Sequence, residues 1–432
     1  MKAKKLRRII IISLLSALVM TITILGIYLY GIFNRTINST VLKNADRNEK
    51  WLVDLKFVKT ELPKKHKNLF FSKTESEFDK DMDLLISKAT GYDDMKIKAE
   101  LAKIINSVND SHTSVDIYGS LIYPVSFFEF EEGIYLNNCS IEYKEFWGKK
   151  LVAVNGYSIE QLRLKLEPFI SNDNQAIMKN EFCNSLKFVE TLKIAGITKG
   201  NNAVFTFEDS KNADVDIKPL ERENLSKAKL ITELPEYADK FPIIKQKSDK
   251  DYWFEYIEQS DTVYVKYNSC LNNSDYSFSN FTKDVFNIID SKKVKTLIID
   301  FRDNGGGNSM IFSPFIREVK KRNNINTKDN LFVIIGRRTF SSAILNVMDL
   351  RNDTEATLIG EPTGGKPNHF GEVKMLHLSN VNIDIYYSSN YFKTTKDNTD
   401  SIYPDINIPL KAISYFNGED DFLSYILSIL VP

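Results

Sequence analysis

The chain has 432 residues, enough for two or three folded domains, and its 43% hydrophobic and 26% charged residues are typical of a globular protein. Lys plus Arg equals Asp plus Glu at 57 each, so no net basic field exists to attract nucleic acid. Cys139, Cys183 and Cys270 lie far apart, with no CxxC or Cys/His cluster, which argues against both a zinc site and a disulfide framework.

The N-terminus has the pattern of a membrane anchor. Residues 1–8 form a basic tail, and residues 9–33 carry no charge. As a helix this run would measure about 37 Å, longer than the bilayer core of about 30 Å. Its C-terminal part carries bulky Ile27, Tyr28, Leu29 and Tyr30 in place of a small-x-small cleavage site, so we expect an uncleaved single-pass transmembrane helix. The basic tail predicts a cytoplasmic N-terminus and an extracytoplasmic remainder at the cell membrane.

The next two regions differ in hydrophobic period. Residues 34–118 carry apolar side chains at helical spacing and end in the polar turn 109–113, so they predict a helical region. Residues 119–220 predict a β-rich region that includes a hairpin around Glu132-Gly133. Within it, residues 148–159 read as a strand, an Asn-Gly turn and a helix start, which resembles the core of PDZ domains.

The C-terminal half predicts an α/β domain. Residues 221–251 are charged and contain prolines, as a linker does, and residues 252–432 then alternate between strands and helices. The expected strands are Thr262–Tyr267, Thr296–Phe301, Leu331–Ile335 and Ala356–Ile359; the expected helices are one that includes Phe278 to Ile289, one over 310–321 and one from Ser342. This order implies a mostly parallel sheet.

Three unusual loops follow strands of this sheet, at the edge where α/β proteins bind ligands. Residues 300–307 end in three glycines, whose N–H groups can approach an oxyanion, although a flexible loop would look the same. Residues 336–343 place Ser341 and Ser342 at a helix start, where serine is either a nucleophile or an ordinary helix cap. Residues 360–366 end in Lys366, either a desolvated base or a solvated turn residue.

The combination of these loops, in this order, resembles the catalytic domain of the C-terminal processing (tail-specific) serine peptidases and their tricorn-core relatives. The resemblance covers about residues 90–410 and implies a crotonase-like fold with no cofactor. It implies that Ser341 is the acyl nucleophile. It further implies an oxyanion hole formed by the N–H groups of Gly305 or Gly306 and of Ser342.

The resemblance leaves the base open, because the family contains two patterns. In one, a lysine at the position of Lys366 deprotonates the serine, and the Ser341-to-Lys366 spacing favours this pattern. In the other, a histidine does so with a neighbouring serine and a distal acid, here His112, Ser111 and Asp400. The absence of an acidic residue after Ser341 departs from the lysine branch.

The remaining histidines suggest little. His369 could line the cleft, His66 lies among lysines on a segment expected to be solvated, and no histidine has metal-ligand spacing. We therefore expect a membrane-anchored serine endopeptidase that acts on extracytoplasmic protein or peptide tails, without a metal. The alternatives are a catalytically degenerate peptide-binding scaffold and an esterase or amidase on the same core; the missing G-x-S-x-G motif disfavours the last.

Overall fold

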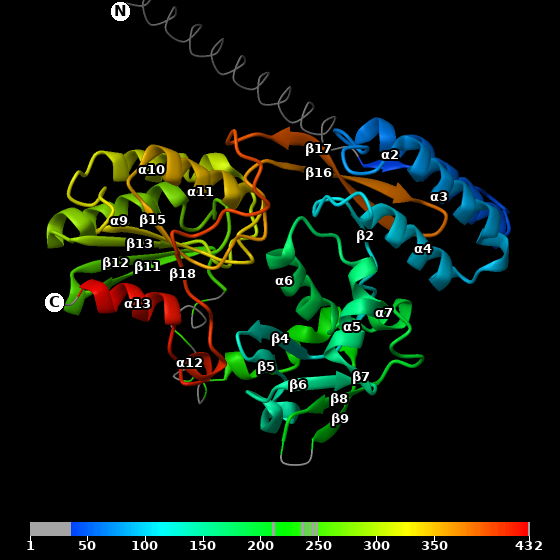
Figure 1. Cartoon of the computed structure of the whole chain (residues 1–432), viewed down its shortest axis with the longest axis horizontal. Coiled ribbons are helices and arrows are strands. Elements are labelled where there is room, and N and C mark those ends of the chain that lie inside the picture. Colours follow the sequence, from blue (N-terminus) through cyan, green and yellow to red (C-terminus); the bar gives the residue numbers. More distant parts are fainter. Residues whose placement is uncertain are drawn as a thin grey trace, which may run out of the picture.

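The computed structural model describes residues 36–209, 212–234, 237, 240, 242, 247 and 249–430. Figure 1 shows a layered α/β domain on one side, three helices on the other and a β-rich module between and below them. Residues 9–33, the expected anchor, lie outside the described residues. Within the described part of the chain, no helix combines the length and the apolar character needed to span a bilayer.

A six-stranded sheet forms the α/β domain, and all of its neighbouring strands are parallel except the first pair. In sheet order the strands are β11 (Tyr252–Ile257), β12 (Thr262–Tyr267), β13 (Thr296–Asp300), β14 (Leu331–Ile335), β15 (Thr357–Gly360) and β18 (Ile406–Asn407). Continuous apolar runs in the central strands explain why both faces of the sheet are buried. The mostly parallel α/β prediction is confirmed.

Helices cover both faces of this sheet. One face packs on α9 (Phe278–Lys292), α10 (Ser313–Lys320) and α11 (Ser342–Asp353) in a single hydrophobic cluster. The other face packs on α13 (Asp421–Leu430). The two predicted helices 310–321 and from Ser342 are present, although residues 309–311 form a separate 3₁₀ turn before α10.

The β-rich module has its own core. Its strands are β3 (Leu121–Ile122), β4 (Val125–Phe130), β5 (Gly133–Cys139), β6 (Leu151–Val154), β7 (Tyr157–Ser158), β8 (Ala203–Phe207), β9 (Ala213–Ile217) and β10 (Leu220–Glu221). Its helices are α5 (Ile159–Leu166), α6 (Gln175–Ser185) and α7 (Val189–Ile194). The expected hairpin around Glu132-Gly133 is present as β4 and β5. Part of the expected linker also packs here, because Ile231 lies buried in this core.

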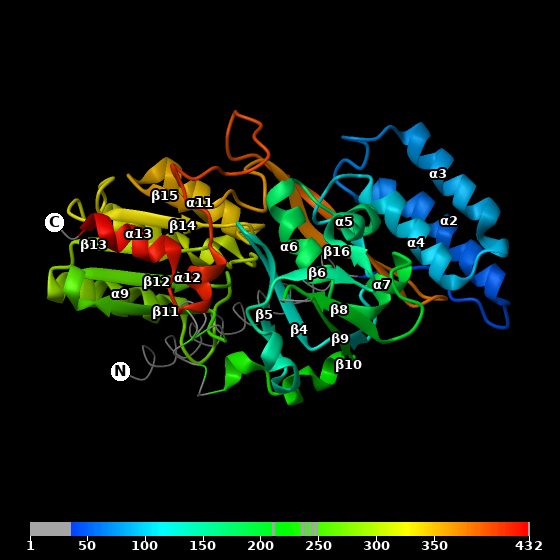
Figure 2. The same cartoon turned by 60° about the horizontal axis from the view of Figure 1, so that its bottom comes forward.

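The N-terminal helices share a core with a long hairpin from the C-terminal half of the chain. The helices are α2 (Arg47–Lys65), α3 (Glu75–Lys88) and α4 (Asp94–Asn106), and the hairpin consists of β16 (His369–Leu378) and β17 (Ile383–Phe392). β1 (Ile37–Asn38) and β2 (Ser114–Val115) complete this sheet at its two edges. The hairpin visibly leaves the α/β domain and lies against the helices (Figures 1 and 2).

A buried ion network supports the loop after β13. Lys266 on β12 is fully buried, and its Nζ lies 3.2 Å from Asp300 Oδ1 and 3.0 Å from Asp303 Oδ2. Arg302 contributes a second cation, 2.9 Å from the other oxygen of Asp300. Since a buried charge is costly without its partner, each member depends on the others.

Lys266→Met is expected to destabilise the fold by about 3–5 kcal/mol, because it leaves two carboxylates with less compensation in the interior. Denaturant unfolding of residues 36–432 measures this. Lys295→Met is the matched control, since Lys295 pairs with Asp261 but is 74% exposed, and should cost less than about 1 kcal/mol. Equal effects of the two substitutions would contradict a structural role for the buried pair.

Candidate active site

Ser341 occupies a strained turn between β14 and α11. Its backbone has φ 53° and ψ −125°, a conformation that residues other than glycine rarely adopt. Thr339 fixes the turn, because its hydroxyl donates to the Phe301 carbonyl at 2.9 Å and accepts from the Gly336 N–H at 3.0 Å. A strained serine on a sharp strand-to-helix turn is the arrangement that exposes a nucleophile in serine hydrolases.

The glycine loop after β13 lies directly against this serine. A side-chain carbon on Gly306, whose φ is +111°, would stand 2.7 Å from Ser341 Cβ, so only glycine fits. Asn304 shapes the loop by accepting from the Gly306 N–H at 2.9 Å and donating to the Tyr267 carbonyl at 2.9 Å. Of the amides predicted for the oxyanion hole, the Gly306 N–H is therefore already hydrogen-bonded to Asn304. Among the described residues, the N–H groups of Gly305 and Ser342 have no acceptor.

His112 lies beside the turn that carries the serine. Its ring stacks on Phe340 with 4.4 Å between centroids, and on His369 with 5.8 Å. Both ring nitrogens are buried and have no hydrogen-bond partner among the described residues. Burial lowers the pKa of His112 to about 4, against the opposing charge of Asp110, so the imidazole is neutral near pH 7.

Asp110 is the carboxylate nearest to His112, with 3.8 Å between Oδ1 and the ring Nδ1. The same Oδ1 accepts the His112 backbone N–H at 3.0 Å. Its Oδ2 accepts from the hydroxyls of Thr113 and Ser388, both at 2.6 Å, and contacts His66 Nε2 at 3.0 Å. Burial alone would raise the pKa of Asp110, but these hydrogen bonds lower it to about 2.

The expectation for His66 was wrong. This residue was predicted on a solvated segment, but it is buried beside Asp110 and 5% exposed. The prediction failed because the lysines around His66 in the sequence point elsewhere, while the ring turns inward at the end of α2.

Lys366 lies near a second buried carboxylate. Its Nζ is 3.8 Å from Asp173 Oδ1, which also accepts the Ser111 backbone N–H at 3.3 Å. Burial raises the pKa of Asp173 to about 6, against the charge of Lys366. The Lys366 carbonyl lies 2.9 Å from His369 Nδ1, so the lysine loop is linked to the ring that stacks on His112. The structure thus places His112 against Phe340, the residue before Ser341, and brings Ser111 and Lys366 to the same carboxylate, Asp173.

Asp400, the expected distal acid, is not brought into this group. Its side chain is exposed and accepts from the Tyr403 hydroxyl at 2.8 Å. Its carbonyl accepts from Asn174 Nδ2 at 2.6 Å, which positions the loop but not a carboxylate. The carboxylates beside His112 and Lys366 are Asp110 and Asp173, neither of which the sequence analysis chose; an acid two residues before the histidine was the available signal for Asp110.

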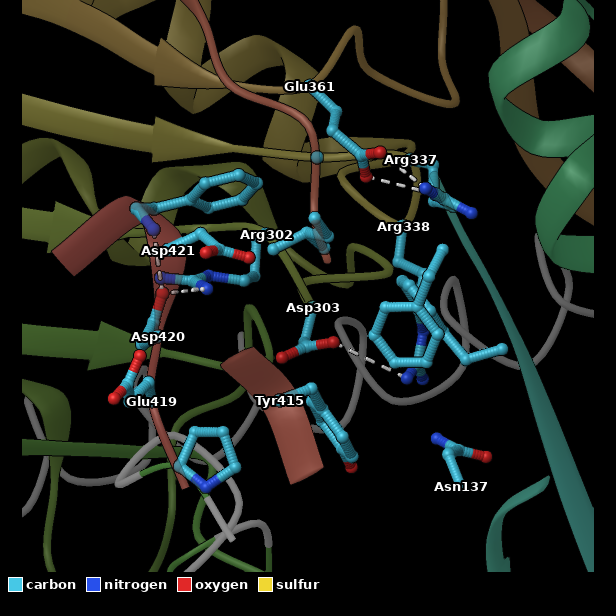
Figure 3. Close-up of a pocket in the computed structure, with 16 residues that line it drawn as sticks. Asn137, Arg302, Asp303, Arg337, Arg338, Glu361, Tyr415, Glu419, Asp420 and Asp421 are labelled. Carbon is cyan, nitrogen blue, oxygen red and sulfur yellow. Dashed lines mark hydrogen bonds and ion pairs between the residues drawn. The ribbon is translucent and has the colours of Figure 1, made fainter. Parts of the chain in front are cut away.

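Ion pairs hold the three strand-end loops together. Arg338 Nη1 lies 3.4 Å from Asp303 Oδ1 and so joins the serine loop to the glycine loop. Arg337 forms a two-pronged pair with Glu361 and so joins the serine loop to the lysine loop. Figure 3 shows both pairs in a pocket that Arg302 and Asp420 also line, between the sheet and the β-rich module. These pairs link the three loops directly to one another.

A cleft of about 360 Å³ opens next to the site. Gly305, Phe340 and Ser111 line its catalytic end. Polar and apolar residues both form its walls: Ser114, Val115, Ile117, Tyr118, Phe169, Ile170, Ser171, Ile177, Asn180, Glu181, Asp303 and Arg338. A groove with both kinds of wall is able to hold an extended peptide or another acyl compound.

Comparison with known proteins identifies the fold. No protein-family model matches the chain, and no curated protein matches it by sequence. Among solved structures, mature CPAF complexed with lactacystin is 13% identical with a TM-score of 0.64, over 89% of this chain and 98% of that one. Mature CPAF alone is 12% identical with a TM-score of 0.60, over 89% of this chain and 96% of that one. The photosystem II D1 C-terminal processing protease is 11% identical with a TM-score of 0.44, over 90% of this chain and 98% of that one.

The chain therefore has the fold of mature CPAF. Proteins named as proteases stand among its structural neighbours, including the D1 processing protease and tricorn protease, as the resemblance to C-terminal processing peptidases predicted.

Two glycines of the same loop should respond differently to alanine. Gly306→Ala is expected to destabilise the protein by about 1–3 kcal/mol, because its φ is positive and the new carbon meets Ser341. Gly305→Ala has open space and an ordinary φ, so it should cost less than about 1 kcal/mol. Thermal and denaturant unfolding measure both. A Gly306→Ala protein as stable as Gly305→Ala would mean that the loop does not contact the serine.

Proposed function

We propose that the chain is a serine peptidase that hydrolyses peptide bonds in protein or peptide tails through an acyl-enzyme on Ser341. The strained backbone of Ser341, packed against Gly306 and preceded by Phe340, on which His112 stacks, is the observation that carries this proposal. The fold shared with mature CPAF supports it, and so does the cleft that Gly305 and Phe340 line.

In this mechanism His112 is the general base. A neutral imidazole can accept the Ser341 proton at neutral pH, and burial keeps His112 neutral above about pH 4. Asp110 is ionised and close enough to stabilise the imidazolium that forms. The Ser341 oxygen attacks the peptide carbonyl, and the protonated His112 then donates its proton to the leaving amine.

Backbone amides stabilise the tetrahedral intermediate. The N–H groups of Gly305 and Ser342 are those without an acceptor among the described residues, and Ser342 begins α11, where the helix dipole favours negative charge. Collapse of the intermediate leaves the acyl group on Ser341. Water, deprotonated by His112, then releases the acid product and regenerates the serine.

Lys366 has a supporting role in this proposal, although its spacing from Ser341 favoured it as the base. Its ammonium is near Asp173, a carboxylate that stabilises positive charge, and its side chain is 26% exposed. A lysine that serves as a base is instead expected in an apolar, desolvated place. Lys366 can hold the loop that reaches His369, and through His369 the ring of His112.

The β-rich module is proposed to be PDZ-like and to hold the substrate chain. A groove of about 380 Å³ runs between β4 and α6 and reaches Arg338, three residues before Ser341. In the described part of the chain β4 pairs with no strand other than β5, and an added strand would lie along its other edge, where the Glu129 carbonyl accepts from Arg337 Nη1 at 2.7 Å. An extended peptide in this groove would continue toward the cleft at the serine.

A degenerate, peptide-binding scaffold is the second candidate, and one observation favours it. Within the described residues, the Ser341 hydroxyl has no hydrogen bond to His112 or Lys366, and the Gly306 amide is held by Asn304. We rank the scaffold second because catalytic hydrogen bonds are often long in unliganded enzymes and form only with substrate.

A fluorophosphonate probe and a peptide substrate test the peptidase directly. Ser341→Ala should abolish labelling, and His112→Ala should lower the labelling and cleavage rates about 100- to 10,000-fold. Lys366→Ala should lower them no more than about tenfold. His377→Ala and Ser428→Ala are controls remote from the site and should react like wild type. Larger losses for Lys366→Ala than for His112→Ala would assign the base to the lysine, and a folded wild type that is never labelled would favour the scaffold.

The membrane anchor is a further part of the proposal. We infer from the basic tail and the uncharged run 9–33 that the chain is held in the cell membrane with its catalytic part outside. The full chain should resist alkaline extraction from membranes, and external protease should degrade residues 36–432. Leu18→Lys should weaken membrane retention, whereas Leu52→Lys, beyond the run, should not. Complete release of the wild type by alkali would contradict the anchor.

A further inference from the structure

Asp110 lies between two imidazoles, only one of which the proposed mechanism uses. His112 lies toward Oδ1, and His66, at the end of α2, contacts Oδ2 at 3.0 Å. The side chains of His66 and Asp110 are almost wholly buried. Phe370 packs against His66, with 5.4 Å between the two ring centroids.

The hydrogen bonds of His66 define its protonation. Its Nδ1 accepts the Asn68 backbone N–H at 3.1 Å and therefore carries no hydrogen. The remaining ring hydrogen is on Nε2, which donates to Asp110 Oδ2. His66 is thus a neutral donor to an ionised carboxylate, a type of hydrogen bond that is stronger than one between two neutral groups.

Asp110 is oriented by this bond together with two hydroxyls. Ser388 on β17 and Thr113 donate to the same Oδ2, so three donors from three parts of the chain fix one oxygen. The other oxygen is then left facing His112, whose backbone N–H it accepts. The Lys67 N–H also donates to the Ser388 carbonyl at 2.9 Å, which ties the end of α2 to β17 at this point.

We propose that His66 is a positioning residue of the active site: it holds Asp110 so that the carboxylate orients His112 against Phe340 and Ser341. The inference rests on the proposed function. It assigns the N-terminal helical region a part in the chemistry, because His66 at the end of α2 supplies one of the three donors that hold Asp110 Oδ2.

Other titratable groups lie near the same centre. They are Asp173 from the loop before α6, Lys366 from the loop after β15, and His369 on β16. None of them donates a hydrogen bond to Asp110 Oδ2 among the described residues. His66 therefore has a distinct role.

Kinetics of two substitutions test the proposal. His66→Leu should lower kcat on a peptide substrate about 10- to 100-fold with KM nearly unchanged, the effect of one hydrogen bond to a charged group. His66→Gln keeps an N–H near the position of Nε2 and should recover much of the loss. His377→Gln is the matched control. His377 also pairs with an aspartate, Asp384, at 2.6 Å, but it lies on the hairpin β16–β17 and its side chain is 30% exposed. This substitution should leave kcat unchanged.

Titration of Asp110 gives a readout that does not need activity. In the Ser341→Ala background, carboxyl ¹³C NMR should show the pKa of Asp110 rising above its starting value of about 2 on His66→Leu, because the charged form loses a donor. The NOE between the rings of His112 and Phe340 should weaken at the same time. Should His66→Leu fail to fold, Ser388→Ala removes another donor to the same oxygen and should change both signals in the same direction.

The outcomes separate the two hypotheses. An inactive wild type would overturn the peptidase, while the titration and the NOE would still decide whether His66 positions Asp110 and His112. An unchanged Asp110 pKa and NOE in His66→Leu, or unchanged kcat despite a shifted pKa, would overturn the positioning role.

Discussion

The buried amide of Asn304 holds the active site together. Its side chain accepts from the Gly306 N–H and donates to the Tyr267 carbonyl, while its backbone carbonyl accepts from the Phe340 N–H at 2.9 Å. One residue therefore links strand β12, the glycine loop and the serine turn. Because it is fully buried, each of these bonds is protected from competition with water. The strain at Ser341 persists because these contacts and those of Thr339 determine the conformation of the turn from several sides.

The site needs three regions of the chain, which contribute to two separate cores. The α/β domain supplies Ser341 and the glycine loop, the turn after α4 supplies Asp110 and His112, and the hairpin that leaves the α/β domain supplies His369. Neither the α/β domain alone nor the N-terminal helices alone would contain all of these residues. Asn174, directly before α6, links the β-rich module to the loops of the α/β domain, since its amide donates to the carbonyls of Thr363 and Asp400 at 3.1 and 2.6 Å.

The sequence predicted those parts of the fold that depend on local pattern. The predicted bounds of β12 and β14 match the structure to the residue. The loops with Gly306 and Ser341 were found through their combination and their order along the chain, because each alone also fits a flexible loop or an ordinary helix cap. The inward turn of His66, the approach of Asp173 to Lys366 and the remote position of Asp400 depend on contacts between residues far apart in the chain, which single-sequence patterns do not encode. The path of β16 and β17 was missed for the same reason.

Strand β16 has a mechanical consequence. Its first residue, His369, stacks on His112, and its far end pairs with β1, the first strand of the described chain, at Leu376 and His377. At about 3.3 Å per residue, the two points lie roughly 25 Å apart along one ribbon. Pairing with β17 along its length makes this ribbon stiff. It therefore fixes the distance between the stacked rings of His112 and His369 and strand β1.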